Sequence, residues 1–294
     1  MKPADILIAI LVAIIWGLAF VASRIALDEL SPELMTALRF TIAAVPCLFI
    51  RKPKIAWSLL ITISFTLFLG QFLSQAYGIA HGVPVGLTSV VVQSQALFTI
   101  GFAAVAFGER PTPMQALGTG IAAIGLLMIC GTVGYDFSAA AFAVLMISPV
   151  SFAVGNLLLR GARGVPIFDL FAWLCLASAI PLFALALIAN GPASTWTSLS
   201  HISLTSALCM LALGGVSTSI AYWLWGRLLR DYPAAQVVPF ALLVPFVGSA
   251  ASSVVFGERF GPLRLAGMLT VIGGIAVMVL AKRPKALPEE PKVA

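Results

Sequence analysis

The chain has 294 residues, of which 61% are hydrophobic and 10% are charged, and its net charge is +6. Soluble domains carry about 25% charged residues, so this composition excludes a water-soluble globular protein and makes lipid the solvent for most of the surface. The basic residues lie between hydrophobic segments and are read as topology determinants, not as a nucleic-acid-binding patch. The expected partners are therefore the lipid bilayer and a small-molecule substrate, with no nucleic acid.

Hydrophobic segments of membrane-spanning length follow one another along the chain. A bilayer core requires about 20 apolar residues per helix. Breaks at charges, Pro and Gly predict ten spans, at 4–27, 32–50, 57–80, 84–107, 112–131, 138–160, 166–189, 202–228, 233–256 and 261–281. The first segment has no small-residue cleavage site and is expected to be a span, not a signal peptide. Residues 282–294 are expected to form a disordered cytoplasmic tail.

The distribution of Lys and Arg predicts the orientation. If the N-terminus is cytoplasmic, most basic loop residues lie inside, and the outside holds only Arg24, Arg259 and Arg264, with Arg39 left within a span. Cytoplasmic loops of membrane proteins are enriched in basic residues. The pattern therefore predicts a multi-pass membrane protein with both termini in the cytoplasm.

An internal repeat divides the chain into two halves. The phrase Phe-Gly-Glu-Arg occurs at 107–110 and again 149 residues later, at 256–259, and further identities hold at the same spacing. Such agreement indicates duplication, with one repeat at 1–134 and the other at 135–281. Each half holds five predicted spans, and because five is odd, the second half must enter the membrane from the opposite side. Inverted repeats of this kind are typical of secondary transporters, which alternate access to a site near the membrane midplane.

Several short motifs carry a resemblance to a known family. They are Trp16-Gly17, Leu38-Arg39-Phe40, 82–87, 93–96 and 107–110 in the first half, and Trp225-Gly226, Val238-Pro239, 243–245 and 256–259 in the second. With these motifs the chain resembles, over nearly its whole length, the EamA-type family of the drug/metabolite transporter superfamily. Within that family it is most similar to bacterial amino-acid exporters of the cysteine/O-acetylserine and aromatic types.

The resemblance implies an all-α integral membrane protein with ten transmembrane helices in two inverted five-helix repeats around a central cavity. It also implies a location in the bacterial inner membrane, alternating access, and efflux of amino acids or related metabolites across that membrane. An exporter of drugs or other small metabolites is the alternative within the same superfamily.

Polar and aromatic side chains inside the predicted spans are the candidate substrate-binding residues, because polar groups are costly in the bilayer. They are Gln71, Gln75, Tyr77, Gln93, Trp16, Asn156, Tyr222, Trp223, Gln236 and His81. Amides can pair with both the ammonium and the carboxylate of an amino acid, and aromatic rings can cover an apolar side chain or an ammonium. The alternative is that these groups bond helix to helix, and for His81 that alternative is favoured.

Other residues are assigned structural or gating roles. Arg39 could meet a substrate carboxylate or bond within the protein, and a structural or gating role is favoured. Glu109 and Glu258 lie at symmetric turns, each followed by an Arg. We interpret them as charge-capped corners and not as a gate or proton site. Among the prolines, Pro84, Pro233 and Pro239 mark starts or bends of spans 4 and 9, and span 9 is expected to bend more during closure.

Enzyme chemistry, cofactors and metals receive no support from the sequence. The two histidines, His81 and His201, lie far apart, and the four cysteines are isolated in apolar runs, so neither a metal site nor a catalytic pair is indicated. A phosphate-binding Gly-rich loop is also missing from the sequence. Since each Asp and Glu is predicted outside the middle of a span, the mode of coupling stays open. A single chain can enclose its own pathway, so a monomer is expected.

Overall fold

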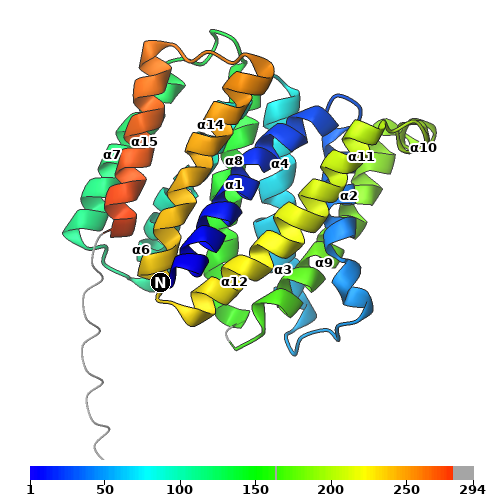
Figure 1. The fold of residues 1–294 in the computed structure, drawn as a ribbon, viewed down its shortest axis with the longest axis horizontal. Coiled ribbons are helices and arrows are strands. Elements are labelled where there is room, and N and C mark those ends of the chain that lie inside the picture. The colour runs from blue at the N-terminus through cyan, green and yellow to red at the C-terminus, as the bar shows by residue number, and fades with distance from the viewer. Residues whose placement is uncertain (163, 281–294) are drawn as a thin grey trace, which may run out of the picture.

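The computed structural model describes residues 1–162 and 164–280, and within that part every regular element is helical (Figure 1). The tail predicted at 282–294 lies outside the described residues. Large apolar side chains such as Leu7, Ile188 and Val254 are exposed on the outside of the bundle. Because such a surface is unfavourable in water, it supports the prediction that lipid surrounds the protein.

The first half contains seven α-helices, some of which are joined by 3₁₀ or π-helical segments. They are α1 (Pro3–Ala26), α2 (Pro32–Ala43), α3 (Trp57–Ile63), α4 (Gln71–Ala80), α5 (Val85–Val91), α6 (Gln95–Phe107) and α7 (Pro113–Cys130). A π-helix, η2 (Ser64–Gly70), joins α3 to α4, and 3₁₀ segments η1 (Val45–Leu48) and η3 (Val92–Ser94) follow α2 and α5.

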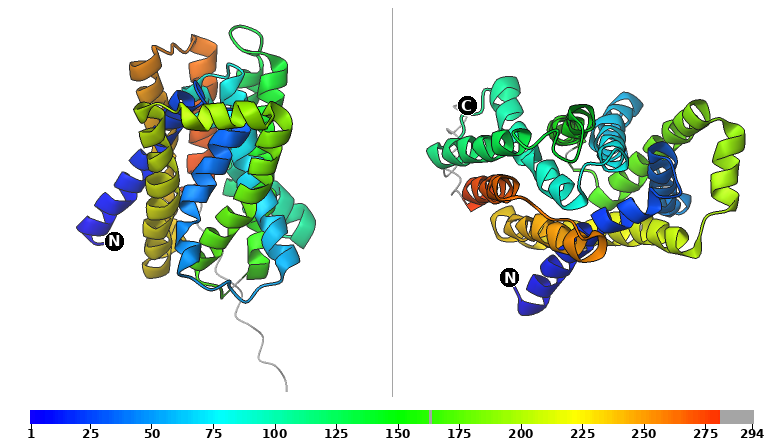
Figure 2. Two further views of the ribbon diagram at one scale, coloured as in Figure 1. Left: turned by 90° about the vertical axis from the view of Figure 1, so that its right-hand side faces the viewer. Right: turned by 90° about the horizontal axis from the view of Figure 1, so that it is seen from above.

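The second half repeats this pattern with one additional short helix. Its α-helices are α8 (Ala139–Leu158), α9 (Ile167–Asn190), α10 (Pro192–Ser200), α11 (Leu204–Leu211), α12 (Ala221–Asp231), α13 (Ala234–Val237), α14 (Leu243–Phe256) and α15 (Pro262–Leu280). The 3₁₀ segments are η4 (Leu159–Ala162) and η6 (Val238–Leu242), and the π-helix is η5 (Ala212–Ile220). Helix α10 lies across one end of the bundle (Figure 2).

Nine helical segments of the described residues are long and apolar enough to cross a membrane. The predicted span at 32–50 is the exception, because α2 has 12 residues before the chain tightens into η1 at Pro46. A 12-residue α-helix is about 18 Å long, against about 30 Å of hydrocarbon. The all-helical, multi-span fold is confirmed, whereas the ten-span count is not.

The duplication is visible in the irregular parts of the backbone. Residues 64–70 of η2 correspond, 149 positions later, to 213–219, which lie inside η5, and η3 corresponds to a stretch that overlaps η6. The glycines that end α6 and α14 are both left-handed, with φ 65° at Gly108 and 67° at Gly257. Helix α1 starts at the lower end in Figure 1, while α8 starts from the loop at the upper end. The two halves therefore run in opposite directions through the bundle.

Helices α7 and α15 are the most closely packed pair, and they lie side by side in Figure 1. A Cβ atom on Gly118 would lie 2.6 Å from the carbonyl oxygen of Gly274, so only glycine permits this approach. Small residues thus allow the close packing of these two helices.

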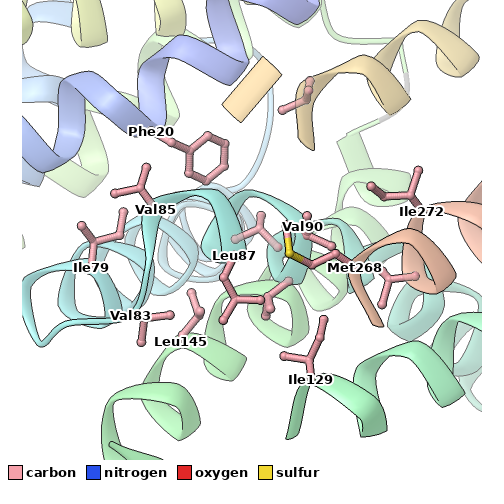
Figure 3. Packing of buried hydrophobic residues seen from close by; sticks show 14 of the residues in the cluster. Phe20, Ile79, Val83, Val85, Leu87, Val90, Ile129, Leu145, Met268 and Ile272 are labelled. Atoms are coloured by element: carbon pink, nitrogen blue, oxygen red, sulfur yellow. The ribbon is translucent and has the colours of Figure 1, made fainter. Parts of the chain in front are cut away.

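Helix α5 is buried on several sides at the contact between the halves. Its Val85, Leu87 and Val90 pack in one apolar cluster with Phe20 of α1 and Ile272 of α15 (Figure 3). Because both repeats hold this short helix, the position of its ends depends on how the two repeats are arranged.

Candidate functional site

The two halves meet around the buried side chain of Arg39, which is 4% exposed. Its Nε donates a hydrogen bond of 2.9 Å to Oγ1 of Thr218, and Nη2 donates one of 3.3 Å to Oγ of Ser217. The ring of Phe72 covers the guanidinium, with 4.2 Å between Cζ and the ring centroid. Over the described residues, Arg39 forms no ion pair with an acidic side chain and Nη1 has no hydrogen-bond acceptor.

The π-helix η5 presents the hydroxyl groups that hold Arg39. Thr218 Oγ1 donates 2.8 Å to the carbonyl of Leu213, and Ser219 Oγ donates 3.1 Å to that of Gly214, each five residues earlier. This spacing is that of the π-helix, in which a wider turn places consecutive side chains differently from an α-helix. Single π-turns inside α-helices occur frequently at functional sites.

Aromatic side chains from both halves surround the same region. The Trp16 indole donates 3.1 Å to the carbonyl of Ser217, and its ring lies 5.3 Å from that of Tyr222. Tyr222 in turn contacts Phe171 edge to face, with ring centroids 5.2 Å apart. These rings form an apolar wall beside the buried guanidinium of Arg39, which is suited to a ligand with one charged end and one apolar end.

Two small hollows lie next to Arg39 and its hydrogen-bond partner. One has no room for a water molecule in this arrangement of the helices and is lined by Ser23, Met35, Thr36, Arg39, Phe72, Gln75 and Ala76. The other has about 20 Å³ of space, enough to hold a water molecule, and is lined by Ala43, Phe168, Phe171, Ala172, Cys175, Thr218, Ser219, Tyr222 and Trp223. Residues of both repeats line the second hollow, so a change in their arrangement changes its size.

The predicted pair Gln71 and Gln75 is buried on one face of α4. Gln75 lines the smaller hollow beside Arg39. The amide oxygen of Gln71 is buried without a hydrogen-bond partner among the described residues. This geometry gives no support to the helix-to-helix alternative for Gln71, because a helix-to-helix bond would occupy that oxygen.

The other predicted residues divide into several groups. Trp16, Tyr222 and Trp223 lie in the aromatic region described above. Gln93 instead donates 3.2 Å to the carbonyl of Ala241 in η6, which is a helix-to-helix bond. Tyr77 stacks on His81, with ring centroids 5.0 Å apart. Asn156 is half-buried on α8, and Gln236 is exposed on α13; neither residue lines either hollow.

The two predicted glutamate corners have different surroundings. Pro84, the N-cap of α5, makes no side-chain cap, and the Glu258 carboxylate accepts from the amides of Val85 at 2.6 Å and Gly86 at 2.9 Å. Glu109, which follows α6, accepts from Arg160 at 2.6 Å. The end of α6 lies at the opposite end of the bundle from the end of α14 (Figure 1). From the sequence, the arginine that follows each glutamate was the expected partner. The contacts described here are instead made with distant parts of the chain.

Glu258 lies at the end of a close seam between α5 and α14. A Cβ on Gly248 would lie 2.7 Å from Cβ of Ser89, and one on Gly86 would lie 2.9 Å from Cα of Ser249. Ser249 also donates 3.2 Å to the carbonyl of Gly86. Small side chains let the two backbones approach, so the bundle is closed between these helices at this end.

Sequence reasoning missed Ser217, Thr218, Phe72 and Phe171. A signal for the first two was present, because Ser-Thr-Ser at 217–219 interrupts an apolar run. Phenylalanines in a membrane protein carry no such signal, since most of them face lipid or other helices.

Comparison with known proteins identifies the family. The sequence model of the EamA-like transporter family matches twice, at residues 4–131 and 139–280. The chain belongs to the EamA-like transporter family. It is therefore a multi-pass membrane transporter, and its family is not an enzyme family.

Individual relatives of this EamA-type transporter share its length. A protein of Salmonella typhimurium named as a probable amino-acid metabolite efflux pump is 32% identical over 96% of this chain and 97% of its own. A probable terminal-alkyne amino-acid exporter of Streptantibioticus cattleyicolor is 26% identical over 92% and 91%. A solved crystal structure matches the fold with TM-score 0.62 at 19% identity, covering 94% of this chain and 96% of that one.

Proposed function

We propose that this EamA-type transporter exports amino acids and related metabolites across the bacterial inner membrane by alternating access. The observation that carries the proposal is the buried cation Arg39, which has Gln75 beside it and aromatic rings from both repeats nearby. An amino acid has the complementary parts, namely two charged groups and an apolar side chain. The relatives named above as probable amino-acid exporters support the same substrate class.

The substrate site of this proposal comprises residues around Arg39. Gln71 and Gln75 provide amide groups, and Trp16, Tyr222 and Trp223 provide the apolar wall. Tyr77, Asn156, Gln236 and His81 remain candidates for steps along the pathway, while Gln93 and Arg39 also tie the halves together. Pro84, Pro233 and Pro239 are proposed as positions where spans 4 and 9 change direction.

The proposed topology has ten crossings, with both termini in the cytoplasm. The crossing that is added to the nine described above is the second in chain order. It consists of α2, Ala44 and η1. The distribution of Lys and Arg supports this orientation. The repeats are proposed to extend over 1–134 and 135–281, and the protein is proposed to act as a monomer.

Alternating access requires each end of the pathway to close in turn. The α5–α14 seam, with Glu258 on the amides of α5, is a closed end in this proposal. Glu109 and Arg160 occupy the corresponding corner at the other end. Export then consists of opening one seam while the other forms, and the rigid-body movement of one repeat against the other carries both changes.

Flux measurements on purified protein in liposomes test the proposal. Radiolabelled amino acids of different side-chain classes are offered one at a time, with empty liposomes as the control. We expect saturable flux for a subset of apolar amino acids. Saturable flux of hydrophobic cations alone would favour a drug exporter, and no saturable flux of any amino acid would refute the amino-acid assignment.

A further inference from the structure

Two buried arginines differ in how their charge is balanced. Arg264 is 5% exposed, and its guanidinium donates to both carboxylate oxygens of Asp136, at 2.8 Å to Oδ2 and 2.5 Å to Oδ1. Arg39 is equally buried, but its two hydrogen-bond partners among the described residues are neutral hydroxyls. A buried charge without a counter-charge is strongly unfavourable, so the arrangement around Arg39 requires an explanation that the one around Arg264 does not.

Arg39 has an unused donor and lines a small hollow, which has no room for a water molecule here, so a ligand enters it only when the surrounding helices move apart. A guanidinium has five N–H donors in a rigid fork that matches a carboxylate. Nε and Nη2 are held by η5, and Phe72 covers the guanidinium, so the group is fixed before any ligand arrives. Preorganised donors bind an anion with a smaller loss of entropy than mobile ones.

We propose that Arg39 binds the carboxylate of the exported amino acid, which supplies the missing counter-charge. The inference rests on the proposed function and specifies which end of the substrate this site recognises. A counter-charge that comes with the ligand is compatible with transport, because a fixed acidic residue would compete with the substrate for Arg39.

The neighbouring groups suit the rest of such a ligand. The ammonium requires acceptors, and Gln71 contributes a buried amide oxygen that has no hydrogen-bond partner among the described residues. Gln75, one turn further along the same face of α4, lines the Arg39 hollow. The larger hollow, with Phe168, Phe171 and Ala172 in its wall, is suited to a small apolar side chain. The site thus favours a zwitterion with an apolar side chain.

Binding of L-leucine and of L-leucinamide to the wild-type protein tests the proposal without any variant. The two compounds differ at the carboxylate, and titration can follow tryptophan fluorescence, to which Trp16 and Trp223 beside the site contribute. A hydrogen bond to a charged group is worth enough to change affinity about 10- to 100-fold. We expect L-leucine to bind more tightly than the amide by that factor.

Two arginine variants make the test specific to the site. Arg39→Gln should remove the preference for the carboxylate, so that both compounds bind with the affinity of the amide. Arg264→Gln is the matched control, because it also removes a buried arginine but should leave the preference unchanged. Arg39→Lys, which keeps the charge and loses the fork, should retain part of it.

The outcomes separate this inference from the proposed function. If wild-type protein binds and transports L-leucine but does not prefer it to L-leucinamide, the carboxylate assignment is wrong and the exporter assignment stands. Unchanged preference in a folded Arg39→Gln variant has the same meaning. If no amino acid binds or is transported by the wild-type protein, the proposed function itself fails.

Discussion

The two ends of the bundle carry the same sequence phrase in different settings. At one end, Glu258 caps α5 and lies beside the seam of Gly86, Ser89 and Gly248. At the other end, Glu109 binds Arg160, and α6 packs mainly against α8. The duplicated chain therefore holds two similar corners in two different arrangements, which is what a transporter with one closed end requires.

Differences in sequence accompany this difference in packing. Counted 149 residues back, Gly248 corresponds to Thr99, and Gly86 corresponds forward to Ala235. Each substitution adds a side chain at a position where the closed seam has none. The comparison teaches that equal motifs do not ensure equal contacts, because the residues beside the motif decide how closely the helices approach.

The largest effect is expected when the close seam is filled. In Gly248→Ala, the new Cβ would lie 2.7 Å from Cβ of Ser89. Overpacking of this kind costs about 1–3 kcal/mol, and it should lower transport by an order of magnitude. Thermal unfolding in detergent and flux in liposomes measure the two effects.

Gly101→Ala is the matched control for this change. A Cβ on Gly101, in α6, would meet no other atom within 4 Å. Alanine is a better helix former than glycine by about 1 kcal/mol, so this variant should be as stable as the wild type or slightly more stable. Equal losses of transport in the two variants would contradict the special role of the seam.

A smaller effect is expected from the glutamates. Glu258→Gln removes a negative charge from the two amides at the start of α5 and should cost about 1 kcal/mol. Glu109→Gln weakens an exposed contact with Arg160, and exposed ion pairs contribute about 0–1 kcal/mol. Unfolding midpoints of both variants, measured at one pH and salt concentration, should rank Glu258→Gln as the less stable. The reverse ranking would show that the corners are not used as described.

The smallest effect concerns the loop that joins α7 to α8 at the Glu258 end. The hydrogen bonds from Arg264 lower the pKa of Asp136 below its ordinary value. A lowered carboxyl pKa contributes stability above the ordinary pKa, and that stability is lost as pH falls through the lowered value. Unfolding midpoints from pH 7 to pH 3 should therefore fall less in Asp136→Asn than in the wild type. Parallel curves would contradict this assignment.

The sequence predicted the spans well because hydrophobic runs of this length have one stable arrangement in lipid. The span at 32–50 was the exception, since hydropathy does not show that Pro46 tightens the helix into η1. The duplication predicted the symmetric corners, but it could not predict that Glu258 reaches across to α5. That contact joins residues more than 170 positions apart, and it depends on packing.

The site was predicted in part. Gln71, Gln75, Trp16 and Tyr222 were found because polar and aromatic groups stand out in an apolar chain. The surroundings of Arg39 were not predicted, because the π-helix η5 determines which hydroxyls face inward. The period of an α-helix does not describe the positions of side chains on a π-helix. Gln93 shows the opposite difficulty. It was predicted as a substrate-binding residue because it is polar and lies within a span, but its side chain bonds one helix to another.

The most direct test of the account is to measure whether the closed end opens during transport. Ser89 is fully buried in the seam, so Ser89→Cys in a background with the four native cysteines replaced reports on that end alone. Reaction with a membrane-impermeant thiol reagent is followed in liposomes with and without saturating L-leucine. We predict slow labelling without leucine and labelling several-fold faster while leucine is transported. Equal rates in both conditions, with leucine flux intact, would contradict alternating access through the α5–α14 seam.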